Sequence, residues 1–256
     1  MAKVDTVGDN YYKPLEYAES FGGCLFWGGC ILSVLALLTD KVAHPTTYDV
    51  LQVAFIIFAF LFFILGLMQR LYLFPRAEDK RKQELLSNSF GVALTHEETV
   101  GYYNNDQTNP FKRLAASVME SSFFTNAIVR RMLRMQRATT VAYVVVYLIA
   151  ALNRSSNLEF LAIAAQALFS EEIIARWLRM EWLRFRSEQV FDNLNRLFTN
   201  KKPFTKPLAQ AQAIDFFSAY ETAKTTAAIS LSSKLFHEHN IALTEEWDRI
   251  RGRLGI

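Results

Sequence analysis

Residues 50–68 read VLQVAFIIFAFLFFILGLM and contain no charged side chain. A helix of about 20 apolar residues crosses the ~30 Å hydrocarbon core of a bilayer. A second charge-free stretch, 21–38, comes shortly before it and is longer than the apolar region of a signal peptide. The two stretches predict a transmembrane hairpin within an N-terminal domain, residues 1–74.

Two weaker apolar stretches follow at 138–152 and 158–178. The first is short and the second is interrupted by polar side chains, so they form either a second transmembrane hairpin (138–178) or a buried hairpin in a soluble helical domain. With the first interpretation, the predicted fold is an all-α membrane protein. It has four transmembrane helices in two hairpins, and its long helices extend into a cytoplasmic helical bundle.

Basic residues are distributed unevenly around these stretches, although the net charge is only +3. The loops 40–49 and 153–157 hold one Lys or Arg each, whereas 69–137 holds eleven and 179–256 holds twelve. The positive-inside rule therefore places both termini and the middle of the chain in the cytoplasm. This predicts a multi-pass protein with two cytoplasmic regions, a helical elbow at 75–137 and C-terminal helices at 179–256.

Prolines and capping residues predict where several helices begin and end. Pro75 is expected to end the helix of the second apolar stretch, and the charged residues 77–86 to form a separate helix. Asn109 and Pro110 are typical of an N-cap followed by a first-turn proline. Because 111–152 lacks Gly and Pro, we expect one continuous helix there.

Residues 158–200 also lack Gly and Pro and predict a second long helix. A further helix is expected at about 208–238 and a short one at 244–253. The second long helix and the helix at 208–238 each carry an apolar stripe, and these stripes either pack on each other or offer a surface to a partner. The first stripe comprises Met180, Leu183, Val190, Leu194 and Leu197.

The sequence has no motif typical of catalysis or cofactor binding. It lacks a Walker loop, G-x-G-x-x-G, H-E-x-x-H and G-x-S-x-G. Its two Cys exclude a Cys-rich zinc site. We therefore predict a protein that is not an enzyme and has no catalytic residues, metal or cofactor.

Polar side chains at membrane depth are the most informative candidates. Glu159, Gln166 and Ser170 lie at i, i+7 and i+11 and form a sparse polar stripe on the fourth stretch. They either line a pore made by several copies or bond neighbouring helices within one chain. In the first stretch, Gly29 and Ser33 form a small-xxx-small pair suited to close helix packing.

Charged residues are predicted at the inner membrane border. Glu171, Glu172 and Arg176 follow the polar stripe, and either gate ion entry or anchor the helix. A basic group precedes the third stretch, where each arginine contributes ~1 kcal/mol if it contacts a lipid phosphate; a solvated helix face is the alternative. This group comprises Arg130, Arg131, Arg134 and Arg137.

The order of these segments resembles that of the SMODS-associating four-transmembrane pore-forming effectors of bacterial anti-phage operons. The resemblance is one of layout: an apolar hairpin, a charged helix, a turn-rich elbow, an Arg-flanked third span and a fourth span that continues into the cytoplasm. The elbow at 89–94 reads SFGVAL and lacks the Trp and Pro of the family pattern, so no functional residue is carried over. The resemblance implies an effector in the bacterial inner membrane that acts in abortive infection.

The leading hypothesis is an oligomeric pore-forming effector that breaches the membrane when it is triggered from the cytoplasm. Its expected partners are membrane lipid and further copies of itself, and the candidate triggers are a cytoplasmic protein or a cyclic nucleotide. Nucleic acid is not favoured, because the net charge is small. The alternative is a membrane-anchored scaffold or sensor that recruits a cytoplasmic partner, and a membrane enzyme or transporter is less favoured than either.

Overall fold

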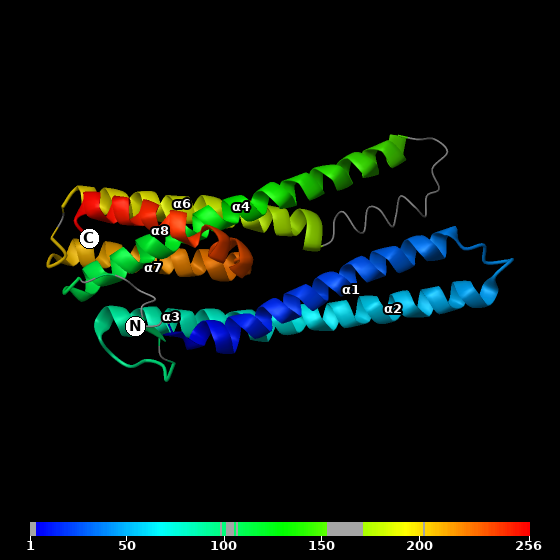
Figure 1. Ribbon diagram of the computed structural model, residues 1–256, viewed down its shortest axis with the longest axis horizontal. Coiled ribbons are helices and arrows are strands. Elements are labelled where there is room, and N and C mark those ends of the chain that lie inside the picture. Colours follow the sequence, from blue (N-terminus) through cyan, green and yellow to red (C-terminus); the bar gives the residue numbers. More distant parts are fainter. Residues whose placement is uncertain (1–3, 98, 101–104, 106, 153–170, 202) are drawn as a thin grey trace. The chain divides into compact units, whose positions relative to one another are not determined.

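The computed structural model describes residues 4–97, 99–100, 105, 107–152, 171–201 and 203–256, which are almost entirely helical (Figure 1). The helical class is thus confirmed, as are two helices long and apolar enough to cross a membrane. The chain divides into two compact units. The apolar unit comprises Tyr11–Pro75 and Gln136–Trp177; the helical unit comprises Met1–Asn10, Arg76–Met135 and Leu178–Ile256.

The apolar unit is built on a hairpin of α1 (Lys13–Leu38) and α2 (Pro45–Met68). These helices contain both of the strong apolar stretches. The turn between them is closed by Asp40, whose Oδ1 accepts hydrogen bonds from the backbone N–H groups of Val42 and Ala43 at 2.8 and 3.3 Å. Pro45 occupies the first turn of α2, where its missing N–H costs nothing.

The expectation that Pro75 ends a helix is wrong. The helix continues from α2 through a π-helical segment, η2 (Gln69–Leu73), into α3 (Phe74–Phe90). In an α-helix the proline ring would clash with the carbonyl four residues back. The wider π turn, in which the N–H of Phe74 bonds to the carbonyl of Gln69, lets the helix pass through the proline.

The same device occurs near the N-terminus. The π segment η1 (Gly8–Tyr12) ends two residues before Pro14, as η2 ends two residues before Pro75. One border between the two units, at 10/11, lies within η1, and another, at 75/76, lies two residues after η2. A third π segment, η3 (Glu171–Ala175), precedes the border at 177/178.

The N-terminus belongs to the helical unit, which the sequence did not indicate. The short strand β1 (Val4–Asp5) pairs antiparallel with β2 (Thr99–Val100). Asp5 also accepts a hydrogen bond from the N–H of Gly8 at 2.9 Å and forms an ion pair of 2.9 Å with Arg81 on α3. These contacts fix the start of the chain to α3 before it enters α1.

The long helix predicted from residue 111 is confirmed as α4 (Pro110–Leu152). Its 43 residues correspond to about 64 Å. The Asn109 cap is also confirmed, because its Oδ1 accepts from the N–H groups of Phe111 and Lys112, both at 3.0 Å. Of the second long helix, the structure describes η3 and α6 (Arg176–Thr199), and residues 158–170 lie outside the described part.

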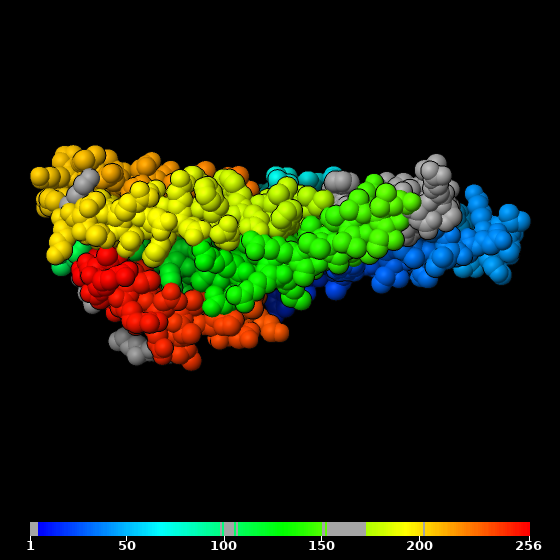
Figure 2. Space-filling view, turned by 90° about the horizontal axis from the view of Figure 1, so that it is seen from above, coloured from blue at the N-terminus to red at the C-terminus, as the bar shows by residue number. Residues whose placement is uncertain are grey.

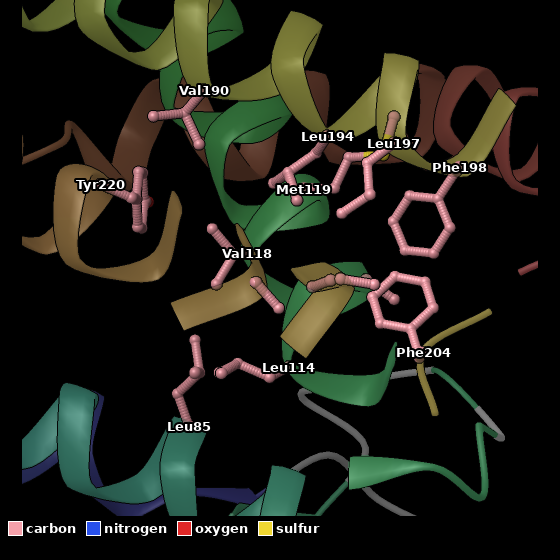
Figure 3. Packing of buried hydrophobic residues seen from close by; sticks show 14 of the residues in the cluster. Leu85, Leu114, Val118, Met119, Val190, Leu194, Leu197, Phe198, Phe204 and Tyr220 are labelled. Atoms are coloured by element: carbon pink, nitrogen blue, oxygen red, sulfur yellow. The ribbon is translucent and has the colours of Figure 1, made fainter. Parts of the chain in front are cut away.

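The core of the helical unit joins α3, α4, α6 and α7 (Pro207–Ala227) (Figure 3). Phe198 at the end of α6 lies against Phe204 in the following linker, with ring centres 5.4 Å apart. All five residues of the predicted α6 stripe are buried in the unit. The stripes of α6 and α7 share one core, so they do not offer the partner surface on which the scaffold alternative relied. The labelled core residues are Leu85, Leu114, Val118, Met119, Val190, Leu194, Leu197, Phe198, Phe204 and Tyr220.

The predicted helix at 208–238 is also wrong, because it is two helices. α7 ends at Ala227, and Ala228 adopts a left-handed conformation with φ 46°. A new helix, α8 (Ser233–Leu254), then begins with Ser232 as its N-cap, whose Oγ accepts from the N–H of Leu235 at 3.3 Å. A left-handed alanine carries no sequence signal, and only the serine pair at 232–233 marks the break.

Candidate functional site

The surface of the α1–α2 hairpin is the first feature that bears on function. No residue of α2 is buried, and the structure describes all of them. Ile56 and Phe60 expose 61% and 62% of their surface, and many other large apolar side chains of the two helices are similarly exposed. The core helix of a soluble protein would be mostly buried, so this surface requires a cover of lipid or protein.

The close approach within the hairpin lies one residue from the predicted small pair. A Cβ on Gly28 would meet the ring of Phe58 on α2 at 2.5 Å. Gly29 is buried, yet a Cβ there would have nothing within 4 Å among its described neighbours. Ser33 is half-buried one turn further along α1. Gly28 is therefore the residue that lets the two helices approach closely.

We expect Gly28→Ala to destabilise the hairpin by about 1–3 kcal/mol, because the added methyl group forces the Phe58 ring to move. Gly29→Ala is the matched control and should be neutral or stabilising by up to about 1 kcal/mol, because alanine favours helix. Thermal unfolding of the two variants in detergent measures the difference. Equal effects of the two substitutions would contradict this packing.

The described part of α4 within the apolar unit has a similar surface. Its large exposed apolar side chains are all aliphatic. Tyr143 of α4 contacts Trp27 of α1, with ring centres 5.8 Å apart, so the third predicted span packs on the first. The exposed aliphatic residues are Val141, Val145, Val146, Leu148, Ile149 and Leu152.

The candidate pore residues fall largely beyond this description. Glu159, Gln166 and Ser170 lie outside the described residues. Glu171 and Glu172 are in η3, but their side chains are outside the described set. Arg176 is half-buried at the first position of α6.

The predicted arginine group follows one side of α4 on successive turns. Arg130 pairs with Glu188 of α6 at 2.6 Å, and Arg131 donates to the carbonyl of Ala127 at 2.8 Å. Arg134 and Arg137 are exposed, and Met135 between them is exposed as well. Because both are exposed, contact of Arg134 and Arg137 with lipid phosphates stays a prediction.

A buried charged cluster, which the sequence did not reveal, joins α3 to α7 inside the helical unit. The Nζ of Lys224 lies 2.6 Å from Oε2 of Glu78 and 3.1 Å from Oε1 of Glu221. The three side chains are mostly buried. We call Glu78, Glu221 and Lys224 the charged cluster.

The charged cluster continues into α4 through a neutral hydrogen bond. Lys224 also lies over the ring of Tyr220, 5.1 Å from its centre. The hydroxyls of Tyr220 and Thr125 on α4 are 2.8 Å apart. Burial raises the pKa of Tyr220 far above its usual range, so the phenol stays neutral. One network thereby connects three helices, two of which run into the apolar unit.

The sequence signal for this cluster was present but ambiguous. Glu78 belongs to the charged run at 77–86, which reads as a solvated helix. Phe74, Ala77 and Leu85 fall on the same face at helical spacing and are buried, and this face carries Glu78 inward. A charged residue next to a sparse apolar stripe, as Glu78 is here, is the sequence pattern that indicates a buried charge.

The charged cluster predicts how stability depends on pH. Burial raises the pKa of Glu221 above its ordinary value of 4.5, Lys224 opposes the shift, and Glu78 adds to it. A raised folded-state pKa means that the folded protein binds more protons than the unfolded chain. The contribution of Glu221 to the free energy of unfolding is therefore complete below pH 4.5 and is lost as the pH rises through the raised pKa.

We expect Glu221→Gln to flatten this pH dependence. The stability of the wild type relative to the variant should fall as the pH increases from 4.5, because only the wild type must ionise a buried carboxyl group. Urea unfolding at several pH values, followed by tryptophan fluorescence to which the buried Trp247 contributes, measures the difference. Parallel pH profiles for the two proteins would contradict this assignment.

Comparisons of the chain with protein-family models, with curated proteins and with solved structures find no match.

Proposed function

We propose that this protein is an oligomeric, pore-forming membrane effector that is triggered through its helical unit. The observation that carries the proposal is the uncovered apolar surface of α1, α2 and the second half of α4. Each large apolar side chain left in water costs about 1.5–3 kcal/mol relative to burial. A bilayer together with further copies of the chain supplies the cover that this surface needs.

The helical paths between the two units support the triggering part of the proposal. The helix of α2 continues through η2 into α3, and α4 passes between the units without a break. Glu78 on α3 and Thr125 on α4 are both tied to α7. A ligand or partner that repacks α7 would therefore act on two helices that lead into the proposed spans.

The proposed mechanism uses mechanical coupling and no chemical step. A signal received by the helical unit shifts the ends of the long helices, and the bundle of spans opens around the polar side chains of the fourth span. Gln166 and Ser170 are the proposed lining groups, because polar side chains at membrane depth face other helices or water. The anti-phage setting and the bacterial inner membrane rest on the resemblance in layout.

Dye release from vesicles tests the pore. The purified full-length chain in dye-loaded vesicles should release dye, and the double variant Gln166→Leu/Ser170→Leu should release it at least about tenfold more slowly, because apolar side chains remove the polar lining. Leu168→Ile on the same span is the control and should match the wild type.

Two outcomes of this experiment would count against the proposal. Unchanged release by the double variant would contradict the assigned lining. If neither the wild type nor the variant Lys224→Met, in which the charged cluster is broken, released dye, the pore function itself would be contradicted.

A further inference from the structure

The outward face of α6 changes its chemistry along the helix axis. The exposed residues recur at helical spacing, first Leu178, Trp182 and Phe185 and then Gln189 and Asp192. The three apolar residues expose 53%, 38% and 57% of their surface. The opposite face of the same turns is buried in the core of the helical unit. One face of one helix is thus apolar up to Phe185 and polar from Gln189 onward.

A change of this kind along the axis is typical of a helix that leaves a membrane. An amphipathic helix on a protein core keeps its outward face polar along its whole length. Here the outward face stays apolar for the turns that follow η3 and the fourth apolar stretch. Tryptophan and other aromatic side chains are enriched at the headgroup level of a bilayer. From Leu178 to Phe185 the rise is about 10 Å, which covers the roughly 5–7 Å of headgroup region on one side and reaches the adjoining acyl-chain boundary.

An arginine of α4 lies near the same level. Figure 2 shows α4 and α6 side by side. The Nδ2 of Asn126 on α4 donates to the carbonyl of Arg184 on α6 at 2.9 Å, which fixes the register of these two helices. Because they run in opposite directions, Arg134, eight residues after Asn126, falls beside the first turn of α6, whereas Arg130 pairs with Glu188 next to the polar end. Arg134 is exposed.

We infer that the stretch Leu178–Phe185 of α6 lies in the headgroup layer of the inner leaflet and, with Arg134, binds anionic phospholipid. The apolar side chains enter the boundary of the acyl chains, and the guanidinium group of Arg134 faces the phosphates. Glu172 precedes Leu178 by about 9 Å of helix and therefore lies deeper than the headgroups. The inference rests on the membrane part of the proposed function and not on the pore.

A fluorescent label at two positions of the same face tests the depth. Phe185→Cys and Asp192→Cys are made separately in the full-length Cys24→Ala/Cys30→Ala chain, labelled with bimane and reconstituted in phosphatidylcholine–phosphatidylglycerol vesicles. The label at 185 should be quenched by lipid brominated near the glycerol and protected from aqueous iodide. The label at 192, about 10 Å further along the helix, should be quenched by aqueous iodide and not by the brominated lipid.

Two results would overturn the inference. Equal iodide quenching at 185 and 192 would place the face in water. Protection of the label at 185 from both quenchers would mean that protein, such as a second copy of the chain, covers the face. A chain that stays membrane-embedded and releases dye in either case would leave the proposed function intact.

The headgroup preference has its own readout. Brominated phosphatidylglycerol should quench the label at 185 more strongly than brominated phosphatidylcholine, and Arg134→Gln should reduce the preference by up to about fivefold, the contribution of one basic residue. Arg196→Gln, on the polar end of the same outward face, is the matched control and should leave it unchanged. Equal quenching by the two lipids in the unsubstituted chain would overturn the anionic preference.

Discussion

Lys224→Met should lower the free energy of unfolding of the helical unit by about 3–5 kcal/mol, because removing one partner of a buried ion pair leaves charge without compensation. Lys224 contacts both Glu78 and Glu221, at 2.6 and 3.1 Å. The substitution keeps the length and apolar stem of the side chain and removes only its charge. Urea unfolding in detergent, followed by tryptophan fluorescence to which buried Trp247 contributes, measures the loss.

Two further variants show whether this loss arises from charge. Lys234→Met on α8 removes an exposed lysine and should change stability by less than about 0.5 kcal/mol. The triple variant Glu78→Gln/Lys224→Met/Glu221→Gln should recover most of the loss, because no uncompensated charge remains. A loss of less than about 1 kcal/mol in Lys224→Met would contradict the role assigned to the charged cluster.

The second large effect concerns the exposed face of α2. The double variant Ile56→Lys/Phe60→Lys should prevent stable membrane insertion, because a lysine near the centre of a membrane-spanning helix costs about 2.5–3.5 kcal/mol. Both side chains are mostly exposed, so the substitutions remove little internal packing. If α2 were a solvent-exposed helix, the same lysines would be neutral or would improve solubility. The sign of the effect therefore distinguishes the two environments.

Val50→Lys provides the matched control on the same helix. Val50 is equally exposed but lies near the start of α2, where a lysine can extend its ammonium group to the interface. Insertion should survive this substitution, as measured by the membrane-bound fraction of the expressed protein. Loss of insertion in both variants, or in neither, would contradict the depth assigned to α2.

The helices that the sequence predicted well are those specified by local signals. The Asn109 cap and the absence of Gly and Pro define α4, and the uncharged runs define α1 and α2. Pro75 misled because a π turn, which has no sequence signature, carries the helix through it. The break at Ala228 was missed for a similar reason, because the surrounding packing holds an alanine in a left-handed conformation.

The candidate site was less accessible to sequence reasoning. A close approach between helices depends on the rotation of both, so the pattern suggested Gly29 where Gly28 faces Phe58. The charged cluster combines Glu78 with Glu221 and Lys224, which follow it by 143 and 146 positions in the sequence. Only the packing of α3 on α7 brings the three side chains together. The polarity change on α6 becomes visible only when its buried face is known.

Extraction of membranes tests the central claim most directly. Membranes from cells that express the full chain are washed with high salt and then with alkaline carbonate, and the pellet is assayed for the protein. Retention in the carbonate pellet is the result predicted for a chain whose α1, α2 and α4 lie in the bilayer. Release by salt or carbonate would show that these helices are covered by protein and would contradict the membrane-embedded account.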